Sequence, residues 1–76
     1  NFQLYPNPTN DLVTISNAAV GATIKVLDAT GRIVSTKIIT SENTTIDLSE
    51  NNSGVYFVSI HGTDGTSSTK KLIVRK

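Results

Sequence analysis

The sequence predicts an all-β domain built as a seven-stranded antiparallel β-sandwich, and three observations support this fold. Val, Ile and Thr are frequent while the strong helix formers Ala, Leu, Glu and Lys are sparse, which is the composition of pleated, half-buried strands. No window keeps an apolar i, i+3, i+4, i+7 pattern long enough for a helix. Turn residues recur at intervals of about eight to twelve residues, which is typical of a two-sheet sandwich.

The first two predicted strands cover residues 2–5 and 11–16. Two prolines end the first strand, because each removes a backbone donor and holds its own φ near −65°. In the second strand, Val13 and Ile15 alternate with more polar neighbours, so we expect their face to be buried. Residues 17–21 are expected to form a loop.

The third and fourth predicted strands, 23–28 and 32–39, form the clearest hairpin. Residues 29–31 connect them and end in Gly31, which can supply a left-handed conformation without a Cβ clash. A fifth short strand is predicted over 44–48, where Ile46 and Leu48 alternate with polar residues.

The sixth predicted strand covers residues 54–61, with Tyr56, Val58 and Ile60 on one face and predicted to be buried. The opposite face also carries apolar residues, which predicts a central strand. A glycine-containing turn at 62–65 leads into a seventh strand over 68–75. There we expect Leu72 and Val74 to face inward.

Length and composition favour one small module. A chain of 76 residues buries only about 60% of its unfolded surface and can build one modest core. Methionine is absent and the sequence begins with Asn1, so we expect residues 1–76 to be one domain cut from a longer polypeptide. Cysteine is also absent, which excludes a disulfide framework and leaves the compartment open. No apolar run approaches the roughly 20 residues needed to cross a bilayer, so no direct membrane span is predicted.

The formal net charge of +1 is too small for a long-range field that would capture nucleic acid, and no nucleic-acid partner is predicted. The C-terminus is nevertheless locally cationic. Packing offers no compelling reason for these charges, and one interpretation is a solvated strand whose charges deter edge-to-edge aggregation. The basic residues concerned are Lys70, Lys71, Arg75 and Lys76.

The sequence predicts no catalytic site, metal site or cofactor. His61 is the only histidine, and Ser59 lies on the same predicted strand face, but no nucleophile elbow or oxyanion donors accompany them. The acidic residues are scattered singly, although folding could still assemble a weak calcium site. For Asp28 and Asp64 we expect hydrogen bonds to turn amides instead.

Four segments together resemble the type A C-terminal sorting domain of the type IX (Por) secretion system. They are Tyr-Pro-Asn-Pro-Thr at 5–9, Asp-Ala-Thr-Gly-Arg-Ile-Val at 28–34, Gly-Val-Tyr-Phe-Val-Ser-Ile at 54–60 and Lys-Lys-Leu-Ile-Val-Arg-Lys at 70–76. The resemblance implies an immunoglobulin-like Greek-key sandwich. The family-motif residues are Tyr5, Pro6, Asn7, Pro8, Asp28, Gly31, Arg32, Val34, Gly54, Tyr56, Val58 and Ile60.

The resemblance also implies a function, that of an address on an N-terminal passenger that passes through the periplasm to the cell surface or the medium. The implied partners are the passenger, the outer-membrane translocon, an outer-membrane shuttle protein and a sortase-like protease that removes the domain. We take the terminal basic segment as the candidate for translocon recognition, because backbone edges and neighbouring cations are common recognition handles. Its residues are Lys70, Lys71, Leu72, Ile73, Val74, Arg75 and Lys76.

An alternative function is that of an adhesive or carbohydrate-binding sandwich attached to an extracellular enzyme. Tyr5 could be exposed for stacking on sugars, although tryptophan is absent and aromatic residues are few. An address must lie at the extreme C-terminus of its parent protein, whereas a binding module can lie anywhere. The position of the segment in the full-length parent therefore separates the two hypotheses.

Overall fold

The computed structural model describes residues 2–76, which form seven β-strands and no helix. Every predicted strand is present, and no strand end differs from its prediction by more than one residue. The strands are β1 (Gln3–Tyr5), β2 (Leu12–Ser16), β3 (Thr23–Asp28), β4 (Ile33–Ile38), β5 (Asn43–Asp47), β6 (Gly54–His61) and β7 (Ser67–Val74).

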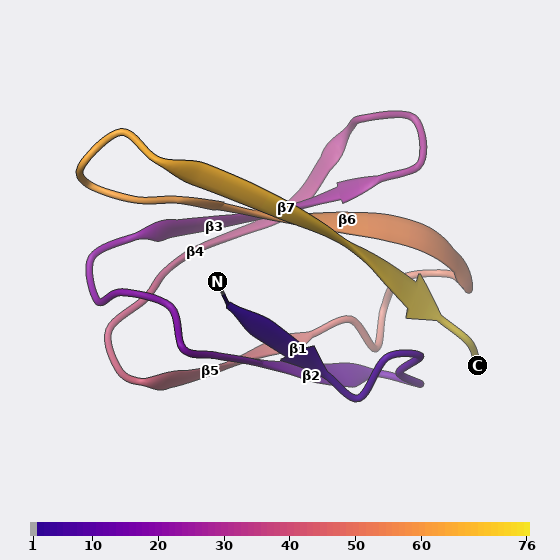
Figure 1. The fold of residues 1–76 in the computed structure, drawn as a ribbon. Helices are drawn as coiled ribbons and strands as arrows, with labels where there is room; N and C mark the ends of the chain where they lie inside the picture. Colours follow the sequence, from indigo (N-terminus) through magenta and orange to yellow (C-terminus); the bar gives the residue numbers. More distant parts are fainter. Residues whose placement is uncertain (1) are drawn as a thin grey trace.

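The strands form two antiparallel sheets that pack face to face as the two layers of a sandwich (Figure 1). One sheet has the order β1-β2-β5 and the other the order β4-β3-β6-β7. β6 lies between β3 and β7, which confirms the central position predicted from its two apolar faces. The chain crosses between the layers three times after β2, namely before β3, after β4 and after β5.

The core fills the space between the two sheets with aliphatic side chains from alternate strand positions. Val13 and Ile15 of β2 are buried, as predicted, and they face buried residues of the other layer. Leu72 and Val74 of β7 also point inward, which settles the register of that strand. The buried apolar residues are Phe2, Val13, Ile15, Ala22, Ile24, Val26, Ile39, Ile46, Leu48, Tyr56, Val58, Ile60, Leu72 and Val74.

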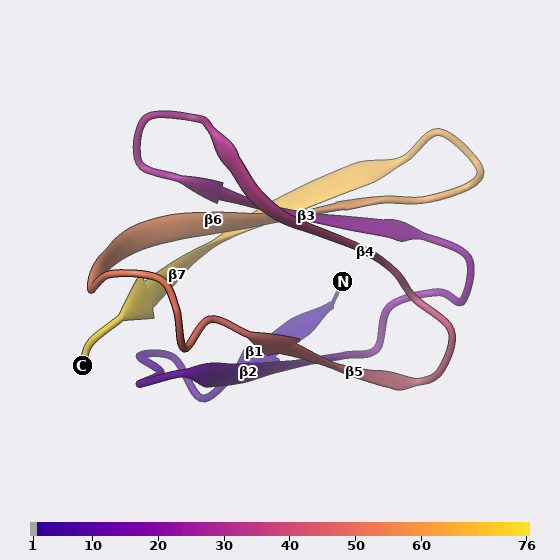
Figure 2. The same cartoon turned by 180° about the vertical axis from the view of Figure 1, so that it is seen from behind.

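Two hairpin turns of the larger sheet contain the glycines that the sequence singled out. Gly31 has a φ of +90° and Gly65 has the same value, in the left-handed region that side chains disfavour. Both turns rise away from the three-stranded layer, one at each end of the four-stranded sheet, as the two opposite views show (Figures 1 and 2).

Aspartate side chains close these turns, as predicted. Asp28 Oδ1 accepts hydrogen bonds from the Thr30 and Arg32 amides, both at 3.0 Å. Asp64 Oδ1 accepts from the Thr66 amide at 3.1 Å and from the Thr66 hydroxyl at 2.7 Å. Such local bonds fix the turn backbone without help from distant residues.

No segment within residues 2–76 forms a helix with the length and hydropathy that a membrane crossing requires.

Candidate functional site

The candidate recognition strand, β7, is fixed at its outer edge by the Pro-Asn-Pro segment near the other end of the chain. Asn7 Nδ2 donates to the Lys71 carbonyl at 2.9 Å, and the Ile73 amide donates to Asn7 Oδ1 at 3.0 Å. These are the two groups with which a neighbouring strand would pair. The carboxamide therefore acts as a one-residue substitute for a strand.

Thr9 extends this contact with its own backbone. Its amide donates to the Ile73 carbonyl at 2.9 Å, and its carbonyl accepts from the Arg75 amide at 2.8 Å, which makes an isolated parallel bridge between Thr9 and Val74. Thr9 is itself buried, and its hydroxyl donates to the Leu12 carbonyl. Residues 7–9 thus cover the C-terminal half of the β7 edge, and a covered edge cannot pair with another chain. The backbone of residues 71–75 is therefore not a free edge, contrary to the sequence interpretation, and the exposed cations remain as the possible recognition groups.

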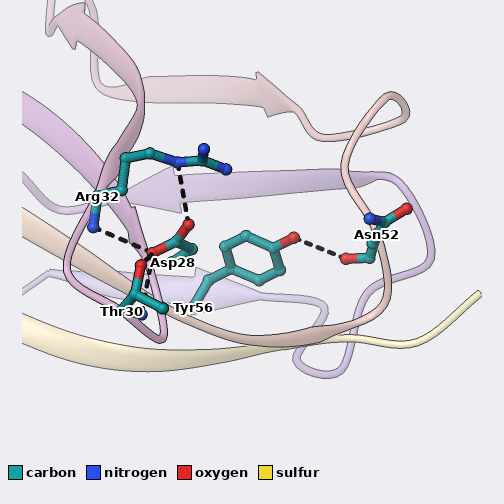
Figure 3. Close-up of polar contacts among 5 residues, drawn as sticks. All are labelled: Asp28, Thr30, Arg32, Asn52 and Tyr56. Carbon is teal, nitrogen blue, oxygen red and sulfur yellow. Dashed lines mark hydrogen bonds and ion pairs between the residues drawn. The ribbon is translucent and has the colours of Figure 1, made fainter.

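A second contact joins the remaining motifs around Tyr56. Tyr56 is 6% exposed, and its hydroxyl donates to the Asn52 carbonyl at 2.7 Å (Figure 3). This is the tyrosine corner found in immunoglobulin-like sandwiches, where a tyrosine near the start of a strand fastens the preceding loop. In the sheet register, Tyr56 stands opposite Asp28 on β3 and Leu72 on β7. The structure therefore brings all four sequence motifs into one connected unit.

The basic residues of the terminal segment do not share one face. Lys70 places its ammonium 5.7 Å from the centroid of the Phe2 ring, on the side of β7 that carries the inward residues. Lys71 stands opposite Phe57 on the outward side, and Arg75 is exposed beyond the strand. Between them, Leu72 and Val74 are buried core residues and Ile73 is half-buried.

Lys76 has a structural role that corrects the sequence interpretation of the terminal charges. Its ammonium donates to the Leu48 carbonyl at 3.2 Å and also to the Ser49 carbonyl. Its backbone amide donates to Ser53 Oγ at 3.0 Å. Lys76 thus fastens the loop between β5 and β6, and this charge has a packing reason after all.

Three aspartates are held ionised by local hydrogen bonds. The pKa of Asp28 lies below its ordinary value, chiefly because the Thr30 hydroxyl donates to the carboxylate. The Arg32 and Thr30 amides and the Arg32 charge lower this pKa further. Thr66 lowers the pKa of Asp64, and Ser49 lowers that of Asp47. Arg32 Nε also lies 3.3 Å from Asp28 Oδ2 (Figure 3).

No three His, Asp or Glu side chains within residues 2–76 gather where they could hold a metal ion.

His61 and Ser59 lie on one face of β6, as predicted, with Ser59 Oγ 3.0 Å from His61 Nε2. Ser59 is buried and also accepts a hydrogen bond from the Thr69 hydroxyl at 3.3 Å. The nearby carboxylate of Asp64 is used by Thr66 within its own turn. The Ser59 hydroxyl is therefore part of a cross-strand polar contact on the outer face of the larger sheet.

Sequence reasoning placed Asn7, Pro8 and Thr9 in a family motif at the end of a strand but assigned them no contact with residues 71–75, and it did not single out Ser53. Asn7 reaches partners 64 and 66 residues away, and no local pattern signals a contact of that separation. The turn positions of Asp28 and Asp64 were the local signal that predicted their hydrogen bonds to turn amides.

Fold and site together define a small immunoglobulin-like β-sandwich whose C-terminal strand is fixed by an N-terminal motif. The chain belongs to the secretion system C-terminal sorting domain family, whose model matches residues 3–75. The chain is also 36% identical over 72 residues to β-agarase A of Zobellia galactanivorans. That match includes 92% of this chain but 13% of the relative, so the chain spans a small part of the curated relative it matches.

Two solved structures share the fold. PorZ, described as an essential bacterial surface component of the type IX secretion system of Porphyromonas gingivalis, superposes with a TM-score of 0.84 at 24% identity. The match covers 100% of this chain and 12% of PorZ. A Bacteroides vulgatus protein of the DUF3244 family, described as an immunoglobulin-like β-sandwich, matches with a TM-score of 0.79 at 24% identity, over 97% of this chain and 83% of its own.

The comparisons confirm the resemblance to type IX sorting domains and the predicted immunoglobulin-like sandwich. The chain is a C-terminal sorting signal of type IX secretion and serves export to the cell surface or the medium.

Proposed function

We propose that this domain is a non-catalytic address that directs an N-terminal passenger through the type IX outer-membrane translocon. Residues 1–76 form the C-terminal unit of a longer secreted protein. An outer-membrane shuttle protein receives the domain after its passage through the periplasm, and a sortase-like protease removes it at the cell surface. The family match and the 13% share of the matched agarase support an address carried by a larger protein.

The proposed recognition element is residues 70–76, and one observation carries this assignment. Asn7 and Thr9 hold the backbone of this segment at the sheet edge, while Lys70, Lys71 and Arg75 stay exposed. A backbone that is fixed before binding loses less conformational entropy when a partner docks. The exposed cations then steer the encounter and set the register more than they add affinity. Lys76, whose ammonium is occupied by loop carbonyls, contributes to the stability of the fold.

Charge reversal tests this assignment without removing strand β7 from the core. Lys70→Glu, Lys71→Glu and Arg75→Glu are combined, and the domain is fused behind a fluorescent passenger that carries an ordinary signal peptide. The host has a working type IX system. Because exposed charges contribute little to stability, we expect the reversed domain to fold with a similar denaturation midpoint, yet to leave the passenger in the periplasm.

The matched control keeps every charge and changes only the side chains, by combining Lys70→Arg, Lys71→Arg and Arg75→Lys. We expect this variant to be exported like the unmodified fusion. Surface delivery of the reversed variant at the control level would show that the basic residues are not the address. The segments at 5–9 and 28–34 would then be the next candidates.

A further inference from the structure

The small net charge of the chain hides a strong separation of charge between the two layers. All seven Lys and Arg residues lie in segments 23–38 and 54–76, which build the four-stranded sheet, with only Asp28 and Asp64 among the acids. The other four acidic residues lie in segments 2–22 and 39–53, which contain no Lys or Arg. The formal charges of these two sets of segments are therefore +5 and −4. The ammonium groups of Lys37 and Lys76 bond to carbonyls of β5 and of the loop after it, so the outward cations beside the apolar side chains of the larger sheet are Lys25 and Lys71.

The outer face of the positive layer carries an apolar row in register across its strands. Ile33 of β4 stands opposite Leu27 of β3, Leu27 opposite Phe57 of β6, and Phe57 opposite Lys71 of β7. Ile33 is 51% exposed, Phe57 is 37% exposed and Leu27 is half-buried. A contiguous exposed apolar patch of this kind marks an interaction surface more often than an isolated exposed residue does.

This row lies in a groove of about 630 Å³. Lys25 and the turn at residues 28–31 line it, together with the Ser59, His61 and Thr69 side chains. The two hairpin ends of the sheet rise on either side of this face (Figures 1 and 2). The groove therefore combines apolar side chains with an available cation, and the one acid that lines it, Asp28, is occupied by Thr30 and Arg32.

We propose that this outer face docks a protein segment that carries acidic and apolar side chains during export. Charge complementarity favours that partner, because its carboxylates would meet Lys25 and Lys71 while its apolar side chains cover Phe57 and Ile33. A second copy of the domain placed symmetrically here would set the same cations against each other. The inference rests on the proposed function and adds a second surface, centred on Lys25 and Phe57, which adjoins the terminal segment at Lys71.

Export of two variants tests the proposal in the fusion described above. Phe57→Thr removes the central aromatic ring but keeps a good strand former, and Lys25→Gln removes a charge with little change of volume. We expect each to lower the amount of passenger at the cell surface at least fivefold, because a few central residues carry most of an interface's affinity. Leu12→Thr is the matched control, since Leu12 is 48% exposed on a strand of the other layer. We expect its export to be unchanged.

Two variants are used because a loss of export in one of them can also arise from misfolding. If Phe57→Thr fails to fold in denaturant melts, the Lys25→Gln result decides. Normal export of the folded variants, while the unmodified fusion is exported, would overturn the proposal. So would an equal loss of export in Leu12→Thr, or self-association of the purified domain through Phe57 in sedimentation experiments.

A peptide titration separates failure of this inference from failure of the proposed function. The isotope-labelled domain is titrated with a short synthetic peptide that alternates Asp and Leu, and with the same peptide carrying Lys in place of Asp. We expect amide shifts on β3, β6 and residues 28–31 with the acidic peptide alone, weakening as salt is raised. Equal responses to both peptides, or shifts centred on β2 and β5, would overturn the proposal. If the unmodified fusion is not exported, the proposed function fails, and the titration alone decides this inference.

Discussion

The carboxamide of Asn7 occupies the position of a missing strand beside Ile73. Its oxygen accepts from the Ile73 amide, and its nitrogen donates to the carbonyl of Lys71. The carboxamide presents a donor and an acceptor side by side at neighbouring positions of the edge, whereas the aspartate carboxylate of the same shape accepts only. This difference explains why asparagine stands between the two prolines.

Replacing Asn7 by aspartate should destabilise the domain in a pH-dependent way. Asn7→Asp keeps the acceptor for Ile73 but turns an ionised oxygen toward the Lys71 carbonyl, so we expect a loss of about 1–3 kcal/mol at neutral pH. Protonation restores a donor, so the difference from the unmodified domain should shrink as pH falls toward the ordinary carboxyl pKa of about 3.9 and be smallest below about pH 3. Urea melts at both pH values measure this. Asn10→Asp, at a nearby exposed amide, is the control, and an equal effect there would contradict the role of Asn7.

Tyr56 should contribute through both its ring and its hydroxyl. Tyr56→Ala is expected to cost about 3–5 kcal/mol, the usual range for a large buried aromatic residue. Tyr56→Phe keeps the ring but removes the bond to Asn52, so we expect a loss of about 1–2 kcal/mol. Denaturant melts of both variants divide the two contributions. A Tyr56→Ala variant within about 0.5 kcal/mol of the parent would behave like a surface substitution and refute the assigned burial.

The turn aspartates predict how stability depends on pH. Asp28, Asp47 and Asp64 have folded-state pKa values below the ordinary value, which is about 3.9 in unfolded chains. Their contribution to stability is therefore present above that value and is lost as pH falls through the lowered folded values. Melting midpoints from neutral to acidic pH should decrease in that window.

Carboxyl NMR titration can assign this dependence residue by residue. Thr30→Ala removes the hydroxyl that lowers the Asp28 pKa most, so that pKa should rise while the Asp64 pKa stays unchanged. Thr66→Ala should have the reciprocal effect. If either variant moved both values equally, a long-range field rather than the local turn would be the cause.

Lys76 and Arg75 are neighbours with the same charge, and they should differ in their effect on stability. Lys76→Met removes the ammonium that binds the Leu48 and Ser49 carbonyls, and we expect a loss of about 1 kcal/mol. Arg75→Met should stay within about 0.5 kcal/mol, as is usual for exposed positions. Thermal melts of the two variants make the comparison, and equal losses would mean that the loop contact does not stabilise the fold.

Local physics made most of the fold predictable from the sequence. The alternation of Val13 and Ile15 with polar neighbours depends only on the two-residue period of a strand. Gly31 marks a hairpin because only glycine adopts its φ without strain. Asp28 and Asp64 accept hydrogen bonds from the amides of residues two positions ahead, so their roles can also be predicted from the local sequence. The family motifs, read in order, then indicated the function that the comparisons confirmed.

The tertiary structure alone decided which distant residues meet. Asn7 and Ile73 are 66 residues apart, and a pattern of short-range preferences contains no information on which edge a loop will cover. The same limit applies to Lys76, whose partners lie on a loop that only the sandwich brings near. It applies as well to the distribution of charge. The sequence shows only the order of the charged residues along the chain, whereas the pairing of strands into two sheets separates them into a positive and a negative layer.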